Sequence, residues 1–432
     1  MKNQIRLYLF NHRTWVYNLQ YIGISILLLI IVTFIDYSTA QWSRNLPQIL
    51  FTKLDLSKTV LSSIAASLLS IAIFTFSSIL SVLTYYSGSI TPRAMENFVG
   101  KKITMKVLGI FMGGFIYCIA SLNFMRSYDE TRYVIAGTVG VVYALICVVY
   151  MVIFIQQTIR DLQPGNVIAD AFEEALEIVK NEVKERDYDN LYENFDRTDF
   201  IPIYSSTSGY LEHFDFGAAK STFQDFEGTF VLTRKNGEFI VKEQEIGRLY
   251  LNQNKNQEEL EEKIEKIKKL YQIQDTKIVL TNYRYSIEKI TEMTLMALST
   301  GINDPTTAVT SIRRLGILLG ELASVDTHHH IMHLDKGCIY YTSNTLEEDL
   351  YHTIIPIVNS GSHSPQVISA LFHGFNVMAL KSTRKNLSLL RKMAKEIYES
   401  TVPNFLLEID RIKVREHYEA FESFAAEKEA QK

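Results

Sequence analysis

The feature that most constrains this chain is a run of 34 residues, 59–92, without a single charged side chain. A helix needs about 20 apolar residues to cross a bilayer, so the run predicts a membrane-spanning helix that continues past the interface. Small polar residues recur in it at alternating steps of four and three, which places them on one helical face. We call the hydroxyl-bearing members the hydroxyl stripe: Ser63, Ser67, Ser70, Ser77, Ser81 and Thr84.

The hydroxyl stripe can be interpreted in two ways. Small residues allow helices to pack closely in a membrane, and hydroxyl groups also line hydrated paths. The mean spacing of 3.5 residues favours a left-handed crossing with a neighbouring helix or with another copy of the same helix. Several copies around an axis would enclose a narrow, uncharged conduit. The sequence is compatible with both interpretations.

Three further apolar windows of spanning length accompany this one, so the sequence predicts four transmembrane helices, at 15–35, 60–83, 107–125 and 133–159. The loop after the second window carries the inner-interface basic residues Arg93, Lys101 and Lys102, against the single acid Glu96. Positively charged loops stay in the cytoplasm, so we expect both termini of this multi-pass protein to be cytoplasmic.

Local signals refine two of these segments. Thr91 followed by Pro92 is typical of a helix N-cap with proline at the first helical position. The segment 93–106 is then either a short helix at the inner membrane interface or a plain connector. In the third window, Gly109 and Gly113 have the spacing that predicts close helix packing.

The remaining sequence predicts an α+β region in the cytoplasm. The expected domains of the whole chain are a transmembrane domain at 1–160, an amphipathic linker helix at 161–199, a small β module at 200–252 and a mainly helical domain at 253–432. Within the β module, Asn236-Gly237 is the strongest hairpin signal. Further on, we expect a charged helix at 256–271, a strand at 277–281, helices at 286–299 and 306–322, a hairpin around Asp335, and several more helices. Thr345 with Glu348 forms a predicted capping box, and Ser364-Pro365 marks another helix start.

The segment 326–333 contains four histidines, His328, His329, His330 and His333. Such a cluster raises the hypothesis of a metal site, but no cysteine or carboxylate follows at ligand spacing. It directly precedes a turn and another strand, so the simpler interpretation is a solvated strand with His328 and His330 on one face. Whether the cluster binds metal stays open, and we assign no metal and no cofactor.

The densest local motif downstream is the turn Gly301, Asn303, Asp304, Pro305 and Thr306. Gly301 can take the left-handed conformation that ends one helix, and Asp304 can cap the next, with Pro305 at its first position. The functional alternative is that free backbone N–H groups at this helix start bind an anion or a carboxylate. Helix capping explains the other residues of this turn, but it does not explain why Asn303 is an asparagine.

Composition narrows the function classes. The net charge of −4 argues against a nucleic-acid-binding protein, which would carry a basic face. The three cysteines give no disulfide framework and no metal spacing. We find no phosphate loop, no nucleophile elbow and no zinc-protease motif, so an enzyme is not expected and no catalytic residue is assigned.

Several stretches resemble a family of bacterial predicted membrane proteins, domain-of-unknown-function family 2254. The similarity extends over nearly the whole chain, and its most specific part is the segment from Ala297 to Pro305. Other matching stretches are Phe76-Ser77, Thr91-Pro92-Arg93, Asn97-Phe98, Leu108-Gly109 with Phe111, Gly113, Phe115 and Tyr117, and Ser208-Gly209-Tyr210-Leu211 with Asp215. The resemblance implies this topology and this order of domains; it implies no activity. We expect the protein to lie in a bacterial inner (plasma) membrane.

These observations favour an oligomeric channel or transport-like pore, in which the second span lines the path and the cytoplasmic part gates or assembles it. The alternative is a non-conducting membrane-anchored sensor or scaffold that uses the hydroxyl stripe only for packing. A membrane-bound enzyme is the third possibility. The expected partners are the lipid bilayer, other copies of the chain and a small ion or solute, and not nucleic acid.

Overall fold

The structure is a computed structural model of the chain, and it describes residues 13–42, 47–93, 102–128, 132–186, 199–223, 227–251, 257–275 and 282–430. The chain divides into two compact units, Met1–Val167 and Ile168–Lys432. We call them the membrane unit and the C-terminal unit.

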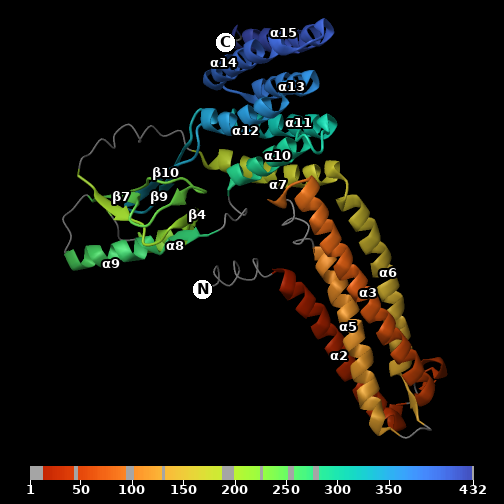
Figure 1. Ribbon diagram of the computed structural model, residues 1–432. Helices are drawn as coiled ribbons and strands as arrows, with labels where there is room; N and C mark the ends of the chain where they lie inside the picture. Colours follow the sequence, from red (N-terminus) through yellow and green to blue (C-terminus); the bar gives the residue numbers. More distant parts are fainter. Residues whose placement is uncertain are drawn as a thin grey trace. The chain divides into compact units, whose positions relative to one another are not determined.

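The membrane unit contains four helices that are long and apolar enough to cross a bilayer: α2 (Arg13–Trp42), α3 (Leu54–Ser89), α5 (Lys102–Phe124) and α6 (Ala136–Asp161). They lie side by side (Figure 1). The four predicted spans are therefore confirmed. Short elements connect them: η1 (Gln48–Leu50), η2 (Met125–Ser127), and the antiparallel pair β1 (Thr52–Lys53) and β2 (Tyr133–Val134).

Helix α3 has two different faces. The face turned toward the other helices carries buried residues at steps of three and four, which is the spacing of a helix seam. These residues are Leu54, Ser57, Leu61, Ala65, Leu68, Ala72, Thr75, Ile79, Val82 and Tyr86. The hydroxyl stripe lies on the opposite, exposed face.

Helix α5 approaches α2 closely because glycines leave room for it. A Cβ at Gly113 would lie 2.3 Å from Ser25 Oγ, and one at Gly109 would lie 3.1 Å from Tyr21 Cβ. The predicted packing role of this glycine pair is thus met within the chain itself.

The amphipathic helix α7 (Pro164–Glu185) begins in the last residues of the membrane unit and continues into the C-terminal unit, and only two residues separate it from the end of α6. It matches the predicted amphipathic helix, with Ile168, Ala171, Ala175 and Val179 buried.

The strands of the C-terminal unit form two sheets that enclose one hydrophobic core. The first has the order β3-β7-β5-β10-β9, with β10 parallel to β5 and the other neighbours antiparallel; the second has the order β6-β4-β8. Two helices, α8 (Phe216–Thr222) and α9 (Gln257–Lys268), add side chains to the same core. The strands are β3 (Ile201–Tyr204), β4 (Gly209–Phe214), β5 (Gly228–Leu232), β6 (Phe239–Ile240), β7 (Glu245–Leu251), β8 (Tyr271–Gln274), β9 (His329–His333) and β10 (Gly337–Thr342).

The prediction of a hairpin at Asn236-Gly237 is wrong. A turn is present, and Gly237 has a φ of +88° that favours glycine. However, β5 before the turn and β6 after it belong to different sheets, and the Gly237 N–H donates to the Leu211 carbonyl of β4 at 2.7 Å. The turn therefore carries the chain from one sheet to the other, because tertiary pairing outweighs the local hairpin preference.

The hairpin of β9 and β10, in contrast, is confirmed, with Cys338 opposite His333 and Thr342 opposite His329. The predicted charged helix corresponds to α9, while the predicted strand at 277–281 lies outside the described residues.

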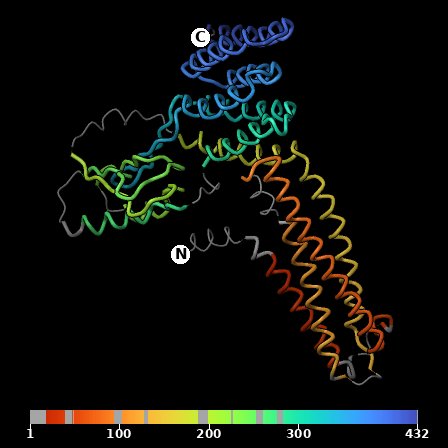
Figure 2. The backbone as a smooth tube through the Cα atoms, in the orientation of Figure 1, coloured from red at the N-terminus to blue at the C-terminus, as the bar shows by residue number. Residues whose placement is uncertain are grey.

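The remaining helices form layers, with α11 against α13 and α13 against α15 (Figure 2). Their bounds are α10 (Tyr283–Ala297), α11 (Pro305–Leu322), α12 (Leu346–Gly361), α13 (Pro365–Lys381), α14 (Arg384–Thr401), η4 (Val402–Asn404) and α15 (Glu408–Ala430). The capping box of Thr345 and Glu348 is confirmed, and α13 starts at Pro365 as predicted.

Candidate functional site

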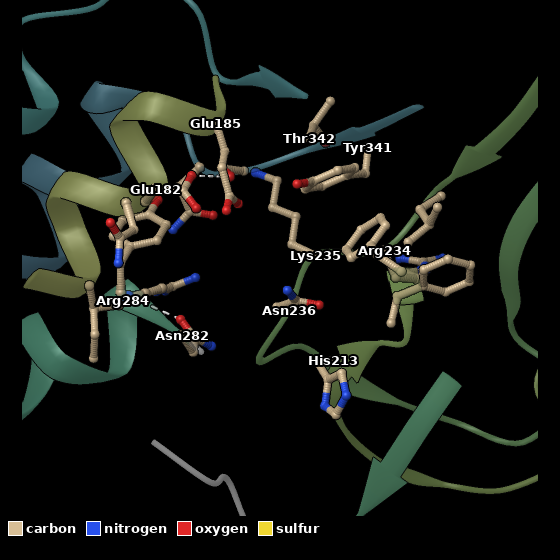
Figure 3. A pocket seen from close by; sticks show the side chains of 18 of the residues that line it. Glu182, Glu185, His213, Arg234, Lys235, Asn236, Asn282, Arg284, Tyr341 and Thr342 are labelled. Atoms are coloured by element: carbon tan, nitrogen blue, oxygen red, sulfur yellow. Dashed lines mark hydrogen bonds between the residues drawn. The ribbon is translucent and has the colours of Figure 1, made fainter. Parts of the chain in front are cut away.

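A cleft of about 430 Å³ opens in the C-terminal unit. It lies between the end of α7, strand β4, the connection after β5, the end of β10 and the start of α10. In Figure 3, Asn282 and Arg284 lie across from Asn236 and His213. The lining combines amides, charged groups and aromatic rings: Asn181, Glu182, Glu185, His213, Phe214, Asp215, Phe216, Arg234, Lys235, Asn236, Asn282, Tyr283, Arg284, Tyr341, Ser343 and Asn344.

One wall of the cleft is fixed through the capping box. Lys235 donates to both carboxylate oxygens of Glu348, at 2.9 and 2.7 Å. The same carboxylate accepts from the backbone N–H of Thr345 at 2.9 Å. Burial by itself would raise the pKa of Glu348, but the bonds from Lys235 and Thr345 outweigh it and lower the pKa. A helix start thus anchors the turn that crosses between the sheets.

A buried cluster supports the opposite wall. His330 on β9 is 1% exposed, and its Nε2 lies 3.0 Å from Glu182 Oε1 of α7 and 2.7 Å from Ser343 Oγ. The Ser343 hydroxyl also donates to Glu182 Oε1. On the other side of the ring, Nδ1 lies 3.0 Å from the carbonyl oxygen of Glu185. The hairpin and the last turn of α7 are therefore joined through one imidazole.

Arg186 extends this cluster toward α10 and α12. Its Nε donates to Glu182 Oε1 at 3.2 Å, and its Nη2 donates to the Tyr283 hydroxyl at 3.4 Å. The Tyr283 hydroxyl in turn donates to Asp349 Oδ2 at 3.0 Å, and Asn344 donates to Asp349 Oδ1 at 3.0 Å.

The two carboxyl groups of the cluster are shifted in opposite directions. Burial tends to raise the pKa of Glu182, but the hydrogen bond and charge of His330, with Arg186 and Ser343, lower it to about 2. Burial raises the pKa of Asp349 to about 6, although Asn344, Arg186 and Tyr283 act in the other direction. Opposite shifts in neighbouring groups are common at functional sites, so the cluster and the cleft form our candidate site.

Sequence reasoning missed this cluster. We also expected a solvated strand at the four histidines, and this prediction is wrong for His330, whose side chain is buried. The expected strand alternation is visible, since His330 is buried and its neighbours His329 and Ile331 are only partly so. The partners of His330 lie 13 to 148 residues away in the sequence, so no local pattern could have identified them. Within the described residues, no group of three His, Cys, Asp or Glu side chains is placed to hold a metal ion.

The structure places the hydroxyl stripe on the outer surface of the single chain. All six members are exposed, and five donate to the carbonyl four residues earlier at 2.9–3.0 Å: Ser63, Ser67, Ser70, Ser81 and Thr84. A hydroxyl that bonds its own helix is satisfied without an outside partner. The stripe can therefore face lipid, water or another copy of the chain.

In the turn between α10 and α11, Asp304 caps α11 as expected. Its carboxylate accepts from the Thr307 N–H at 3.0 Å and from the Thr307 hydroxyl at 2.5 Å, and these bonds lower its pKa. The expectation for Gly301 is wrong, because the left-handed conformation falls on Asn303, with φ +48°. Asparagine is one of the few residues other than glycine that tolerates this region, which gives Asn303 a structural reason. Pro305 begins α11, and Thr306 is exposed beside it.

The predicted N-cap at Thr91 is present: Pro92 and Arg93 are helical, and the Arg93 N–H donates to Thr91 Oγ1 at 3.4 Å. Lys101 lies outside the described residues, and of Lys102 the structure describes only its place as the first residue of α5. The inner-interface role of these basic residues stays a prediction.

No curated protein and no solved structure matches the chain. Residues 11–376 match the model of a family described as a predicted membrane protein, DUF2254. This match includes all four membrane helices and both sides of the candidate site. The chain belongs to the predicted membrane protein family DUF2254.

Proposed function

We propose that this protein is a membrane-anchored sensor or scaffold whose C-terminal unit binds a small polar solute in the cleft. The observation that carries the proposal is the place of α7. This helix supplies Glu182 and Glu185 to the cleft wall, and it begins two residues after the last membrane helix ends. A solute that contacts the end of α7 therefore acts on the segment that continues from the membrane.

The lining indicates the class of solute. Lys235 and Glu182 are already paired within the protein, whereas the amides of Asn181 and Asn236 offer both donors and acceptors at the cleft. Pockets fix their ligands with a few polar groups set among apolar ones, and here Phe214 and other aromatic side chains provide the apolar part. A small solute rich in hydrogen-bonding groups fits this lining.

The test uses the purified full-length chain in detergent. Its thermal unfolding is followed in the presence of amino acids, sugars and nucleotides, because a solute that binds only the folded state raises the midpoint. The variant Asn236→Trp, which fills the cleft, should abolish any such rise. Asn359→Trp, on the exposed side of α12, should leave it intact. A rise that survives Asn236→Trp would contradict binding in the cleft.

A second candidate, the oligomeric pore, is favoured by the hydroxyl stripe. The seam of α3 is used up by packing within the chain, so the outward hydroxyls are available to other copies. A groove of about 390 Å³ between α3 and α6 also begins beside Thr59 and Ser63. In a ring of copies the stripe would line an uncharged path for a small ion or solute.

Cysteine at Ser70 or Ser77 separates the two candidates. If the hydroxyl stripe lines a water-filled path, these cysteines should react with a membrane-impermeant thiol reagent in intact membranes. Cysteine at Leu69, which is exposed on a neighbouring part of α3, provides the lipid-facing control. Equal protection at all three positions would exclude the pore.

A further inference from the structure

The contacts of His330 define how many protons the buried cluster holds. A carbonyl oxygen can only accept, so the contact with the Glu185 carbonyl requires a hydrogen on Nδ1. In a neutral imidazole with that hydrogen, Nε2 is a bare acceptor. Yet Nε2 faces two oxygens, Glu182 Oε1 and Ser343 Oγ, which also contact each other.

These three atoms form a triangle, and its three contacts need at least two hydrogens, because one hydrogen on Nε2 can point between the two oxygens. Ser343 supplies one, which reaches the Glu182 carboxylate. The contacts of Nε2 then require one more hydrogen, shared between Glu182 and His330. Arg186 Nε donates to the same oxygen of Glu182, which favours the carboxylate form and places the shared proton on the imidazole.

The surroundings accommodate a charged imidazole. The ring of Tyr341 stacks on it with centroids 4.3 Å apart and an angle of 8° between the planes, and aromatic faces attract cations. With the proton in place, the two cations Arg186 and His330 are balanced by the carboxyl groups of Glu182 and Asp349. The titratable and charged groups around the imidazole are Glu182 and Glu185 on α7, Arg186 directly after this helix, His328 and His329 beside the imidazole, Tyr341 on β10, Tyr283 on α10 and Asp349 on α12.

We propose that the Glu182–His330 cluster is a proton-dependent latch that holds the last turn of α7 against the β9–β10 hairpin. Loss of the shared proton leaves two acceptors, Nε2 and Glu182 Oε1, facing each other at 3.0 Å, and the latch loosens. The closed latch holds one proton more than the loosened one, so a rise in pH weakens it. This inference concerns α7 and the hairpin alone and does not require the cleft to bind a solute.

Hydrogen exchange of the full-length protein in detergent tests the latch. Exchange rates of peptides covering 178–186 and 329–343 are divided by the rates of unstructured peptides at the same pH. Because opening is coupled to the release of one proton, we expect this ratio to rise on the order of tenfold between pH 6 and pH 8. The ratio for α13, which the cluster does not touch, should stay constant.

Two variants decide the outcome. In Glu182→Gln the amide can donate to a bare Nε2, so no extra proton is needed and the pH dependence should disappear. Glu262→Gln, in a surface ion pair with Lys266, should keep it. A ratio independent of pH in the unchanged protein, or a pH dependence that survives Glu182→Gln, would overturn the latch.

A second measurement needs no variant at Glu182. In protein labelled with ¹⁵N-histidine, the His330 resonances are identified by their loss in His330→Gln. We expect both ring nitrogens to have the chemical shifts of protonated nitrogen at pH 7. A bare Nε2 at that pH would refute the shared proton.

Discussion

The two units of this protein satisfy buried polar groups in different ways. Inside the membrane unit, hydroxyls bond mainly to neutral partners: Tyr117 donates to the Ala136 carbonyl at 3.0 Å, and Tyr143 donates to the Ile110 carbonyl at 2.9 Å. The C-terminal unit also buries one cluster of ionisable groups, which bond to one another across α7, β9, α10 and α12.

The physical reason lies in the surroundings of each unit. A charge is expensive to place within a bilayer, whereas carbonyl oxygens of neighbouring helices accept hydroxyl protons without any charge. Buried ion clusters are tolerated in a unit that folds in water when every member has a partner. A hydrogen bond between groups that do not titrate stays the same when the pH changes, whereas one between ionisable groups does not. We therefore expect the ionisable cluster of the C-terminal unit to respond to pH.

The largest effect should come from removing one charge of the cluster. Glu182→Ala leaves Arg186 and His330 buried without their carboxylate, which should lower the free energy of unfolding of the C-terminal unit by about 3–5 kcal/mol. Urea denaturation followed by limited proteolysis measures this loss. Glu262→Ala removes an ion pair that is shorter, at 2.7 Å, but exposed, and should leave the denaturation midpoint in place. Equal midpoints for both variants would contradict a structural role of the cluster.

The second effect is the pH dependence that Asp349 gives to stability. Its pKa is raised from 3.8 to about 6, so the folded protein binds more protons than the unfolded chain between these values. Stability should therefore increase as the pH falls from 7 toward 4, by up to about 3 kcal/mol. The pKa of Glu182, near 2, keeps its contribution constant through most of this window and begins to reduce it only near pH 4.

Denaturation midpoints of the unchanged protein and of Asp349→Asn, measured at pH 5, 6 and 7, test this dependence. The variant has no carboxyl group to titrate and should show a flatter profile. If both profiles have the same slope, another group is responsible.

In the membrane unit the corresponding weak point is steric and not electrostatic. Gly113→Leu places atoms where Ser25 lies, 2.3 Å from the position of a Cβ, and should cost about 1–3 kcal/mol through overpacking. Gly23→Leu, on α2, has no heavy atom within 4 Å of its Cβ position and should be tolerated. Thermal unfolding in detergent distinguishes the two, and neither variant should alter the pH dependence of stability.

The smallest effect is expected at the turn before α11. Asn303→Ala keeps a left-handed backbone without the tolerance of asparagine, and should cost about 1 kcal/mol. Gly301→Ala meets open space and has no left-handed φ, so it should be neutral. The opposite order of midpoints would restore the original interpretation of Gly301.

Local sequence patterns predicted some features of these regions and not others. The apolar windows predicted all four membrane helices, because spanning a bilayer depends on the length and composition of a single segment. The capping residues Asp304 and Thr345 predicted where α11 and α12 begin, because a cap involves neighbours three residues apart. Pro365 predicted the start of α13, because proline suits the first position of a helix. The turn at Asn236-Gly237 was also recognised, but not the sheet to which the following strand belongs.

By itself, the sequence determined the membrane helices, the starts of α11, α12 and α13, and the hairpin of β9 and β10. Tertiary structure alone decided that His330 is buried against Glu182, that α3 turns its hydroxyl stripe away from its own bundle, and that Asn303 carries the left-handed conformation. The reason is the range of the forces involved. Caps, turns and hydropathy act between near neighbours, whereas a buried charge is stabilised only by groups that folding brings together from distant parts of the chain.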